Sequence, residues 1–117
     1  MEDNLIYIVE QIIKFSQDGK FTNPSSDEWL RLHALFYIAL EKADDIQIST
    51  AITLDHNLEL PFYMACDLYQ KRLYLKSDNR QYMTEFARFL RLNSNSWNYL
   101  ADYFDKVAHQ LTASSNT

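Results

Sequence analysis

The 117-residue sequence predicts an all-α fold, and three observations indicate this class. One glycine and two prolines leave too few turn residues for a sheet-rich protein. Hydrophobic residues make up 47% of the chain, enough for one core in a chain of this length. They recur mostly at spacings of three and four, which is the period of an amphipathic helix. We therefore predict a single domain over residues 1–113, with five or six helices in an orthogonal or bundle-like array, followed by a frayed tail at 114–117.

Residues 26–45 form the most apolar helical segment, since eleven of the fifteen residues from Trp29 to Ala43 are apolar or aromatic. At about 100° per residue they form two apolar faces. The first face, which we expect to be the core, comprises Trp29, Leu32, Phe36, Ala39, Leu40 and Ala43. The second face comprises Leu30, Ala34, Tyr37 and Ile38. We expect the first helix or the segment 46–54 to cover this second face, which otherwise is an interface for a second copy or a partner.

The other predicted helices each show one apolar stripe. They cover residues 3–17, residues 61–76, the stretch from the capping-box spacing of Asp78 and Gln81 to the polar turn at 93–96, and residues 97–113. The stripes consist of Leu5, Val9 and Ile12; Phe62, Ala65, Cys66, Tyr69 and Leu73; Tyr82, Phe86, Phe89 and Leu90; and Trp97, Leu100, Ala101, Phe104, Val107, Ala108 and Leu111.

Residues 45–59 fit two structures. The β-branched residues Ile46, Ile48, Thr50 and Ile52 alternate with other residues, which is typical of a strand. A lone strand has unpaired edges, however, and no second strand is recognisable in the sequence. We expect a short helix or an irregular segment over the core. A strand here would have to pair with another molecule.

Trp29 and Trp97 each begin the pattern Trp-x-x-Leu-x-x-x-Phe, and Tyr63 lies between them at a spacing of 34 residues. This pattern resembles the first helix of a tetratricopeptide repeat. Cys66 and Gln70 occupy the matching places in the middle copy, and the closing proline is absent. We interpret the pattern as a likeness to a helical hairpin and not as membership of that family.

The sequence offers little for catalysis. Gly19 is the only glycine and cannot build a phosphate-binding loop. Cys66 is the only cysteine, so an intrachain disulfide and a cysteine-based zinc site are both excluded. We interpret His33 as a histidine at the edge of the core and His56 as a solvent-exposed turn residue. The sequence predicts no enzyme and no cofactor, and an enzyme with an unrecognised site is the lowest-rated alternative.

Asp102, Asp105 and His109 share one face of the last helix and could bind a divalent metal weakly. An exposed face with two carboxylates and a histidine is more often simply solvated, and we predict no metal site. The N-terminus lacks a secretory signal pattern, and the longest apolar run, residues 34–40, is too short for a membrane span. We therefore expect a cytoplasmic protein with no membrane association.

The formal net charge of −5 is unevenly distributed. Residues 1–70 carry four Lys and Arg against twelve Asp and Glu. Acidic residues that bracket the segment 45–59 are expected to attract a basic protein partner: Glu41, Asp44, Asp45, Asp55 and Glu59. Tyrosine and tryptophan, which dominate interface energetics, are abundant in this chain. The sequence therefore predicts a protein-interaction module, most concretely an immunity or inhibitor-type protein that binds a basic toxin or enzyme.

Residues 71–91 have the opposite charge and support an alternative. Their six basic residues are interleaved with tyrosines: Lys71, Arg72, Lys76, Arg80, Arg88 and Arg91. Cations beside stackable rings are suited to RNA or single-stranded DNA. The whole chain is acidic, with a pI near 5.0, which is unusual for a nucleic-acid-binding protein. We therefore rank nucleic-acid binding second.

Overall fold

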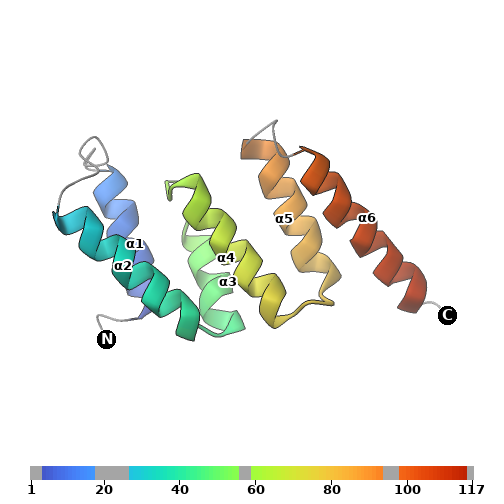
Figure 1. The fold of residues 1–117 in the computed structure, drawn as a ribbon, viewed down its shortest axis with the longest axis horizontal. Coiled ribbons are helices and arrows are strands. Elements are labelled where there is room, and N and C mark those ends of the chain that lie inside the picture. The colour runs from blue at the N-terminus through green and yellow to red at the C-terminus, as the bar shows by residue number, and fades with distance from the viewer. Residues whose placement is uncertain (1–3, 18–26, 56–58, 94–97, 116–117) are drawn as a thin grey trace. The chain divides into compact units, whose positions relative to one another are not determined.

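The computed structural model describes residues 4–17, 27–55, 59–93 and 98–115, which form six α-helices and no strand (Figure 1). The helices are α1 (Leu5–Gln17), α2 (Asp27–Lys42), α3 (Asp45–Leu54), α4 (Phe62–Leu75), α5 (Arg80–Asn93) and α6 (Asn98–Ser115). The predicted all-α class is confirmed, with six helices in the described residues. The chain divides into two compact units, residues 1–71 and 72–117, and the single-domain organisation stays a prediction.

The core of the first unit surrounds the predicted core face of α2. All six residues of that face are buried, and Phe36 is completely inaccessible to solvent. Helix α1 packs against α2 and α3, and it runs in the opposite direction to α2 (Figure 1). Phe15 of α1 stacks on Trp29 with 5.8 Å between ring centroids. The helix begins after Asn4, whose side-chain oxygen accepts a hydrogen bond from the Ile6 amide at 2.8 Å. Asp3, which the sequence offers as the N-cap of this helix, lies outside the described residues.

Helix α3 resolves the ambiguous segment, and the expected short helix is confirmed. Asp44 caps it, because its carboxylate accepts a hydrogen bond from the Gln47 amide at 2.8 Å. The Gln47 side chain accepts one in return from the Asp44 amide at 3.0 Å, which completes a capping box. Negative charge destabilises the C-terminal end of a helix and stabilises the N-terminal end. The acidic residues between α2 and α3 are therefore unfavourable for the end of α2 but favourable for the start of α3.

The β-branched residues of α3 fit a helix for two reasons. Thr50 and Thr53 donate their hydroxyl hydrogens to the carbonyl oxygens four residues earlier, at 2.9 and 3.0 Å. Ile48 is completely buried in the core. Burial at a helical spacing therefore overrides the alternating pattern.

Helix α4 begins directly after Pro61, one residue past its predicted start, and the Pro61 carbonyl accepts a hydrogen bond from the Ala65 amide at 3.1 Å. Its core face differs from the predicted stripe. Met64 and Leu68 are buried in the core of the first unit, whereas Phe62 and Cys66 are only partly buried. The core face of α4 is therefore rotated by part of a turn from the predicted one.

In the second unit, α5 and α6 are antiparallel neighbours (Figure 1). Asn79 caps α5 through a 3.0 Å hydrogen bond from the Tyr82 amide to its side-chain oxygen. The Phe86 and Phe104 rings lie 5.0 Å apart. Helix α6 continues to Ser115, past the expected start of the frayed tail. Trp97, predicted as the first residue of the apolar stripe of this helix, lies outside the described residues.

Candidate functional site

The second apolar face of α2 is largely uncovered. Leu30 and Ile38 expose 56% and 51% of their surface, and Ala34 between them is also exposed. These three residues, the outer stripe, follow one another at intervals of four and lie opposite the core face. The prediction that α1 or the segment 46–54 covers this face is wrong for these residues. Helix α3 packs against α1 instead, and it buries Ile48 and Ala51 in the shared core.

Tyr37, the fourth residue of that face, is partly buried and turned toward α4. Its hydroxyl donates a hydrogen bond to Asp67 Oδ2 at 2.5 Å. Burial and the Asp67 carboxylate raise the pKa of Tyr37. Tyr37 therefore contributes to the contact between α2 and α4, and it borders the outer stripe rather than belonging to it.

His33 lies in an aromatic cluster on the α4 side of α2. Its ring centroid is 5.6 Å from that of Trp29, 5.1 Å from that of Tyr37 and 5.9 Å from that of Tyr63. The histidine is partly buried, which agrees with its interpretation as a residue at the core edge. Burial and Asp67 raise the pKa of Tyr63. This side of α2 is therefore an aromatic packing surface.

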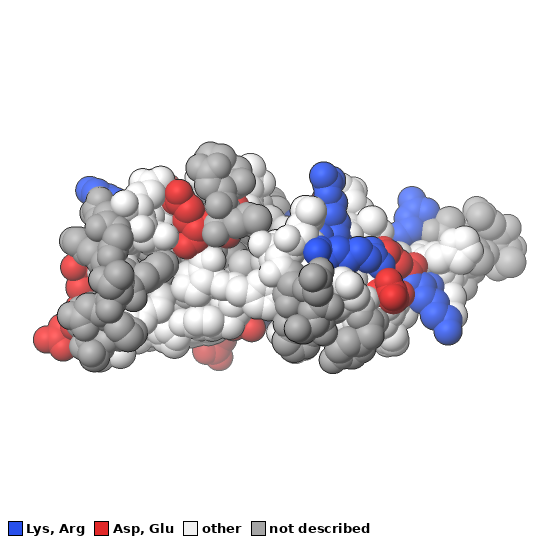
Figure 2. All heavy atoms as spheres, turned by 90° about the horizontal axis from the view of Figure 1, so that it is seen from above, with Lys and Arg blue, Asp and Glu red and all other residues white. Residues whose placement is uncertain are grey.

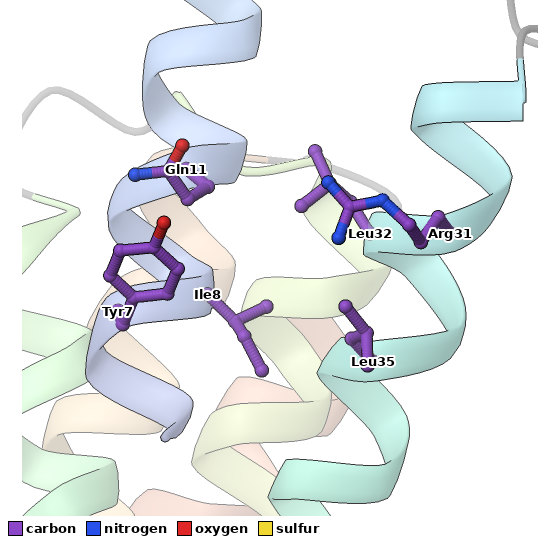
Figure 3. Close-up of a pocket in the computed structure, with 6 residues that line it drawn as sticks. All are labelled: Tyr7, Ile8, Gln11, Arg31, Leu32 and Leu35. Carbon is purple, nitrogen blue, oxygen red and sulfur yellow. The ribbon is translucent and has the colours of Figure 1, made fainter. Parts of the chain in front are cut away.

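The other side of α2 forms a small pocket with α1. Its volume is about 120 Å³, and its lining comprises Tyr7, Ile8, Gln11, Arg31, Leu32 and Leu35 (Figure 3). The Arg31 side chain extends from α2 toward α1, over the apolar side chains between the two helices (Figure 3). No carboxylate in the described part of the chain pairs with Arg31. The pocket is therefore a small hollow between the two helices, whose lining combines aliphatic side chains with the polar groups of Tyr7, Gln11 and Arg31.

The predicted acidic residues differ in accessibility. Glu41 and Asp44 are exposed, whereas Asp45 and Glu59 are only partly accessible. Asp55 is buried, with 6% of its surface accessible. Its Oδ1 accepts hydrogen bonds from the amides of Glu59 at 2.6 Å and Leu60 at 3.0 Å. Asp55 therefore holds the turn before α4 and is not available to a partner, which corrects its predicted place on the acidic surface. His56 lies outside the described residues.

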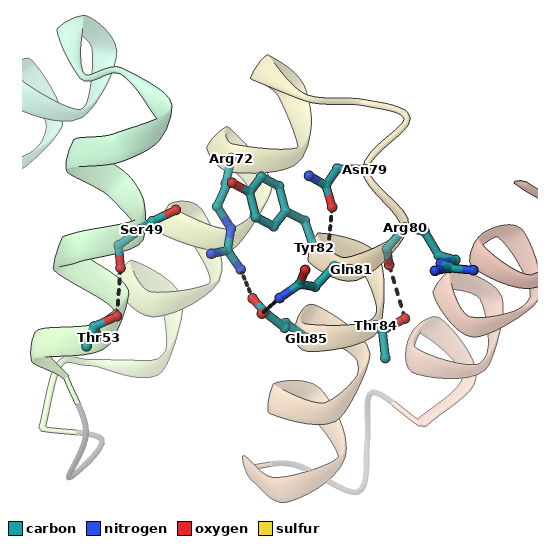
Figure 4. Close-up of polar contacts among 9 residues, drawn as sticks. All are labelled: Ser49, Thr53, Arg72, Asn79, Arg80, Gln81, Tyr82, Thr84 and Glu85. Carbon is teal, nitrogen blue, oxygen red and sulfur yellow. Dashed lines mark hydrogen bonds and ion pairs between the residues drawn. The ribbon is translucent and has the colours of Figure 1, made fainter. Parts of the chain in front are cut away.

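Two of the six predicted nucleic-acid-binding residues are used within the second unit. Arg72 is buried, and its Nη2 lies 2.5 Å from Glu85 Oε2. Its guanidinium carbon lies 3.9 Å from the centroid of the Tyr82 ring. Figure 4 shows the guanidinium between this ring and Glu85. Gln81 donates a further hydrogen bond to Glu85 at 3.1 Å. Arg72 therefore joins the end of α4 to α5 and is not accessible to a phosphate.

Arg91 joins α5 to α6. Its guanidinium nitrogens lie 2.7 Å from Asp102 Oδ1 and 2.5 Å from Asp105 Oδ2. These two hydrogen-bonded carboxylates raise the pKa of Arg91. The same carboxylates were the candidate metal ligands with His109, and the described residues contain no group of three metal-ligating side chains.

The remaining basic residues differ in accessibility. Lys76, Arg80 and Arg88 are exposed, and Lys71 is partly buried. On the face seen in Figure 2, one group of red atoms lies among the blue atoms, so acidic side chains adjoin basic ones there. This arrangement gives less support to nucleic-acid binding than the sequence alone.

Cys66 is partly buried on α4. Burial, with a smaller contribution from Asp67, raises the pKa of its thiol to about 11. The thiol is therefore protonated at neutral pH and is a poor nucleophile.

Comparisons with protein-family models, with curated proteins and with solved structures give no match. None of the described helices combines the length and apolarity that a membrane crossing requires. The functional argument therefore depends on the geometry of α2 and its surroundings.

Proposed function

We propose that this chain is a non-enzymatic protein-interaction module that binds a basic protein through the outer stripe of α2. The observation that carries the proposal is the exposure of Leu30 and Ile38 on a helix whose opposite face is fully buried. Exposed apolar residues that are contiguous along a helix are typical of a contact surface. Helix–helix recognition through such a face is a recurring binding mode.

Charge supports a basic partner. Residues 1–71 carry five Lys and Arg against twelve Asp and Glu, a balance of −7. Glu41 presents an exposed carboxylate near the end of α2, three residues after Ile38 of the outer stripe. Asp44, which follows α2, is also exposed, although its carboxylate caps α3. Opposite charge accelerates association, and apolar burial then slows dissociation. An immunity or inhibitor-type protein that neutralises a basic toxin or enzyme has these properties, and that is the concrete form of the proposal.

Photocrosslinking in the native host tests the proposal. A photoreactive amino acid replaces Ala34, the centre of the outer stripe, and a matched variant carries it in place of the exposed Arg88. We expect one major crosslinked protein with an excess of Lys and Arg at position 34, and none at position 88. The same crosslink should be lost when Ile38→Asp is added.

Two outcomes contradict the proposal. A crosslinked product of twice the chain's own mass would identify the stripe as a homodimer interface. Products that persist with Ile38→Asp, or that are equal at both positions, would show that the outer stripe is not a specific contact surface.

A further inference from the structure

We infer that Tyr63 and Asp67 on α4 hold an arginine of the basic partner, with its guanidinium stacked on the Tyr63 ring and paired with the Asp67 carboxylate. We call these two residues the arginine site. The inference rests on the proposed function, because it names a side chain through which the same partner is recognised. The arginine site adjoins the outer stripe, since Tyr37, which borders that stripe, is hydrogen-bonded to Asp67.

The two residues of the arginine site are neighbours on the surface of α4, because residues four apart lie on the same side of a helix. Tyr63 exposes 47% of its surface, and Asp67 is partly accessible. The ring of His33 borders that of Tyr63, with 5.9 Å between the centroids. An aromatic ring and a carboxylate therefore reach the surface together, beside the contact between α2 and α4.

Asp67 carries a charge that the described part of the chain does not neutralise. Its Oδ2 accepts the hydrogen bond from Tyr37, which leaves Oδ1 for a further donor. None of the described basic side chains forms an ion pair with it, including Lys71 one turn later on α4. Burial raises the pKa of Tyr63 and of Cys66, and the Asp67 charge raises both further. A cation from another molecule would therefore find an unpaired carboxylate here.

The second unit shows how such a pair of residues holds an arginine. Tyr82 and Glu85 are three residues apart on α5, and the Arg72 guanidinium lies between them (Figure 4). Its carbon is 3.9 Å from the centroid of the Tyr82 ring, and its Nη2 is 2.5 Å from Glu85 Oε2. Tyr63 and Asp67 provide the same two groups at a similar helical spacing, and no arginine of the described residues occupies them.

The charges around the arginine site also favour a cation. The first unit has a net balance of −7. On α2, the exposed Glu41 shares the side of Tyr37, whereas Lys42 lies about 140° further around the helix. Arg31 extends toward α1 (Figure 3). Lys71 is the one basic residue of α4 within the first unit, so the carboxylates Asp67 and Glu41 outnumber it.

Arginine suits the site better than lysine. A guanidinium is planar, so it can stack on an aromatic ring while its edge donates two hydrogen bonds to a carboxylate. A lysine ammonium is a compact and strongly hydrated charge without this geometry. Arginine and tyrosine are also enriched among the residues that contribute most to binding free energy at interfaces.

Peptide display on the full chain tests the inference. The library consists of random peptides of about 15 residues, long enough to span both the arginine site and the outer stripe. We expect the selected peptides to share an arginine, whose replacement by lysine or citrulline lowers the affinity at least about tenfold. Asp67→Asn should have the same effect, although it keeps an acceptor for the Tyr37 hydroxyl and thus the contact between α2 and α4.

Two variants of Tyr63 separate the ring from the hydroxyl. Tyr63→Leu should lower the affinity about as much as Asp67→Asn, whereas Tyr63→Phe should keep most of it, because the ring remains. The matched controls are Tyr103→Leu, which removes a ring that is 58% exposed, and Asp78→Asn, which removes an exposed carboxylate. Neither control should change the affinity.

The variants also separate failure of this inference from failure of the proposed function. Peptides that lose affinity with Ile38→Asp but not with Asp67→Asn or Tyr63→Leu would overturn the inference and leave the proposed function intact. Peptides that depend on Asp67 and Tyr63 but not on Ile38 would support the arginine site and overturn the outer stripe as the contact surface. Equal affinity with lysine in place of arginine would overturn the inference, and a library without binders would overturn both proposals.

Discussion

Tyr37 on α2 donates its hydroxyl hydrogen to Asp67 on α4, with 2.5 Å between the oxygen atoms. This bond directs one residue of the second apolar face of α2 toward α4 and leaves the other three in water. Burial and the neighbouring carboxylate raise the pKa of Tyr37, because both disfavour a second negative charge at this position. The bond therefore stabilises the contact between α2 and α4 only while the phenol is protonated.

Tyr37→Phe is expected to lower the free energy of unfolding by about 1 kcal/mol at neutral pH, since Asp67 loses a hydrogen-bond donor. The pKa of Tyr37 is higher in the folded state than its unfolded-state value near 10, so the protonated phenol stabilises the fold fully below pH 10. This stabilisation is lost as the pH rises from the unfolded-state value toward the folded-state value. The variant should therefore lose less stability than the wild type above about pH 10. Urea unfolding across this range measures both effects. Parallel pH profiles for the two proteins would contradict the assignment.

The two faces of α2 should respond very differently to truncation. Phe36 is completely buried, so Phe36→Ala is expected to destabilise the fold by about 3–5 kcal/mol. Leu30 is 56% exposed, so Leu30→Ala is expected to change stability by less than about 0.5 kcal/mol. Thermal and chemical unfolding of the two variants tests the contrast. A large loss with Leu30→Ala would mean that the outer stripe is covered within the free chain.

Asp55 should act as a structural residue although it was predicted as part of the acidic surface. Asp55→Ala leaves the amides of Glu59 and Leu60 without their acceptor and should cost about 2 kcal/mol of stability. The exposed Glu41 is the matched control, because Glu41→Ala should leave stability nearly unchanged. The denaturant midpoints of both variants, compared with that of the wild type, test this prediction. Charge reversals intended to test partner binding should therefore use Glu41 and leave in place both Asp55 and Asp44, which caps α3.

Glu85→Ala is expected to destabilise the second unit by about 2 kcal/mol, because the buried Arg72 would lose its hydrogen-bond acceptor. Replacing both residues, as in Arg72→Met with Glu85→Leu, should be less harmful than the sum of the single changes. The exposed Asp102 provides a comparison, since Asp102→Ala should have a far smaller effect. A double-mutant cycle by chemical unfolding measures the coupling, and additive changes would contradict it.

Cys66 should react slowly with alkylating reagents. With a pKa of about 11, its thiolate fraction near pH 8 is about a hundredfold or more below that of an ordinary cysteine. Iodoacetamide labelling, followed by mass spectrometry, should be correspondingly slow in the native protein and fast in denaturant. The same rate in both conditions would show that the thiol is not shielded by the fold.

The sequence was informative where one helical face is clearly apolar. All six residues of the core face of α2 were predicted to be buried, and all six are. Their spacing matches the helical period, and none of them carries a charge that would favour exposure to water. The segment 45–59 was harder, since its β-branched residues alternate like those of a strand. The capping box of Asp44 and Gln47 was the missed signal, and it lies at the required spacing in the sequence.

Residue type and spacing could not show which charged side chains are buried. Asp55 and Glu41 are both acidic residues near the ends of helices, yet only Asp55 accepts backbone hydrogen bonds across a turn. Arg72 and Arg88 share a basic segment, but only Arg72 is buried against Glu85 and Tyr82. Such differences depend on contacts between helices. The pocket beside Arg31 has the same origin, because α1 and α2 each supply part of its lining.

The exposed Leu30 and Ile38 also affect the behaviour of the protein in concentrated solution. At neutral pH a formal net charge of −5 keeps the copies apart. That repulsion disappears near the pI of about 5.0, while the apolar attraction between exposed stripes remains. Purification and crystallisation near this pH would therefore favour precipitation. The surface that makes α2 suitable for a partner also makes the free protein least soluble where its charge is neutralised.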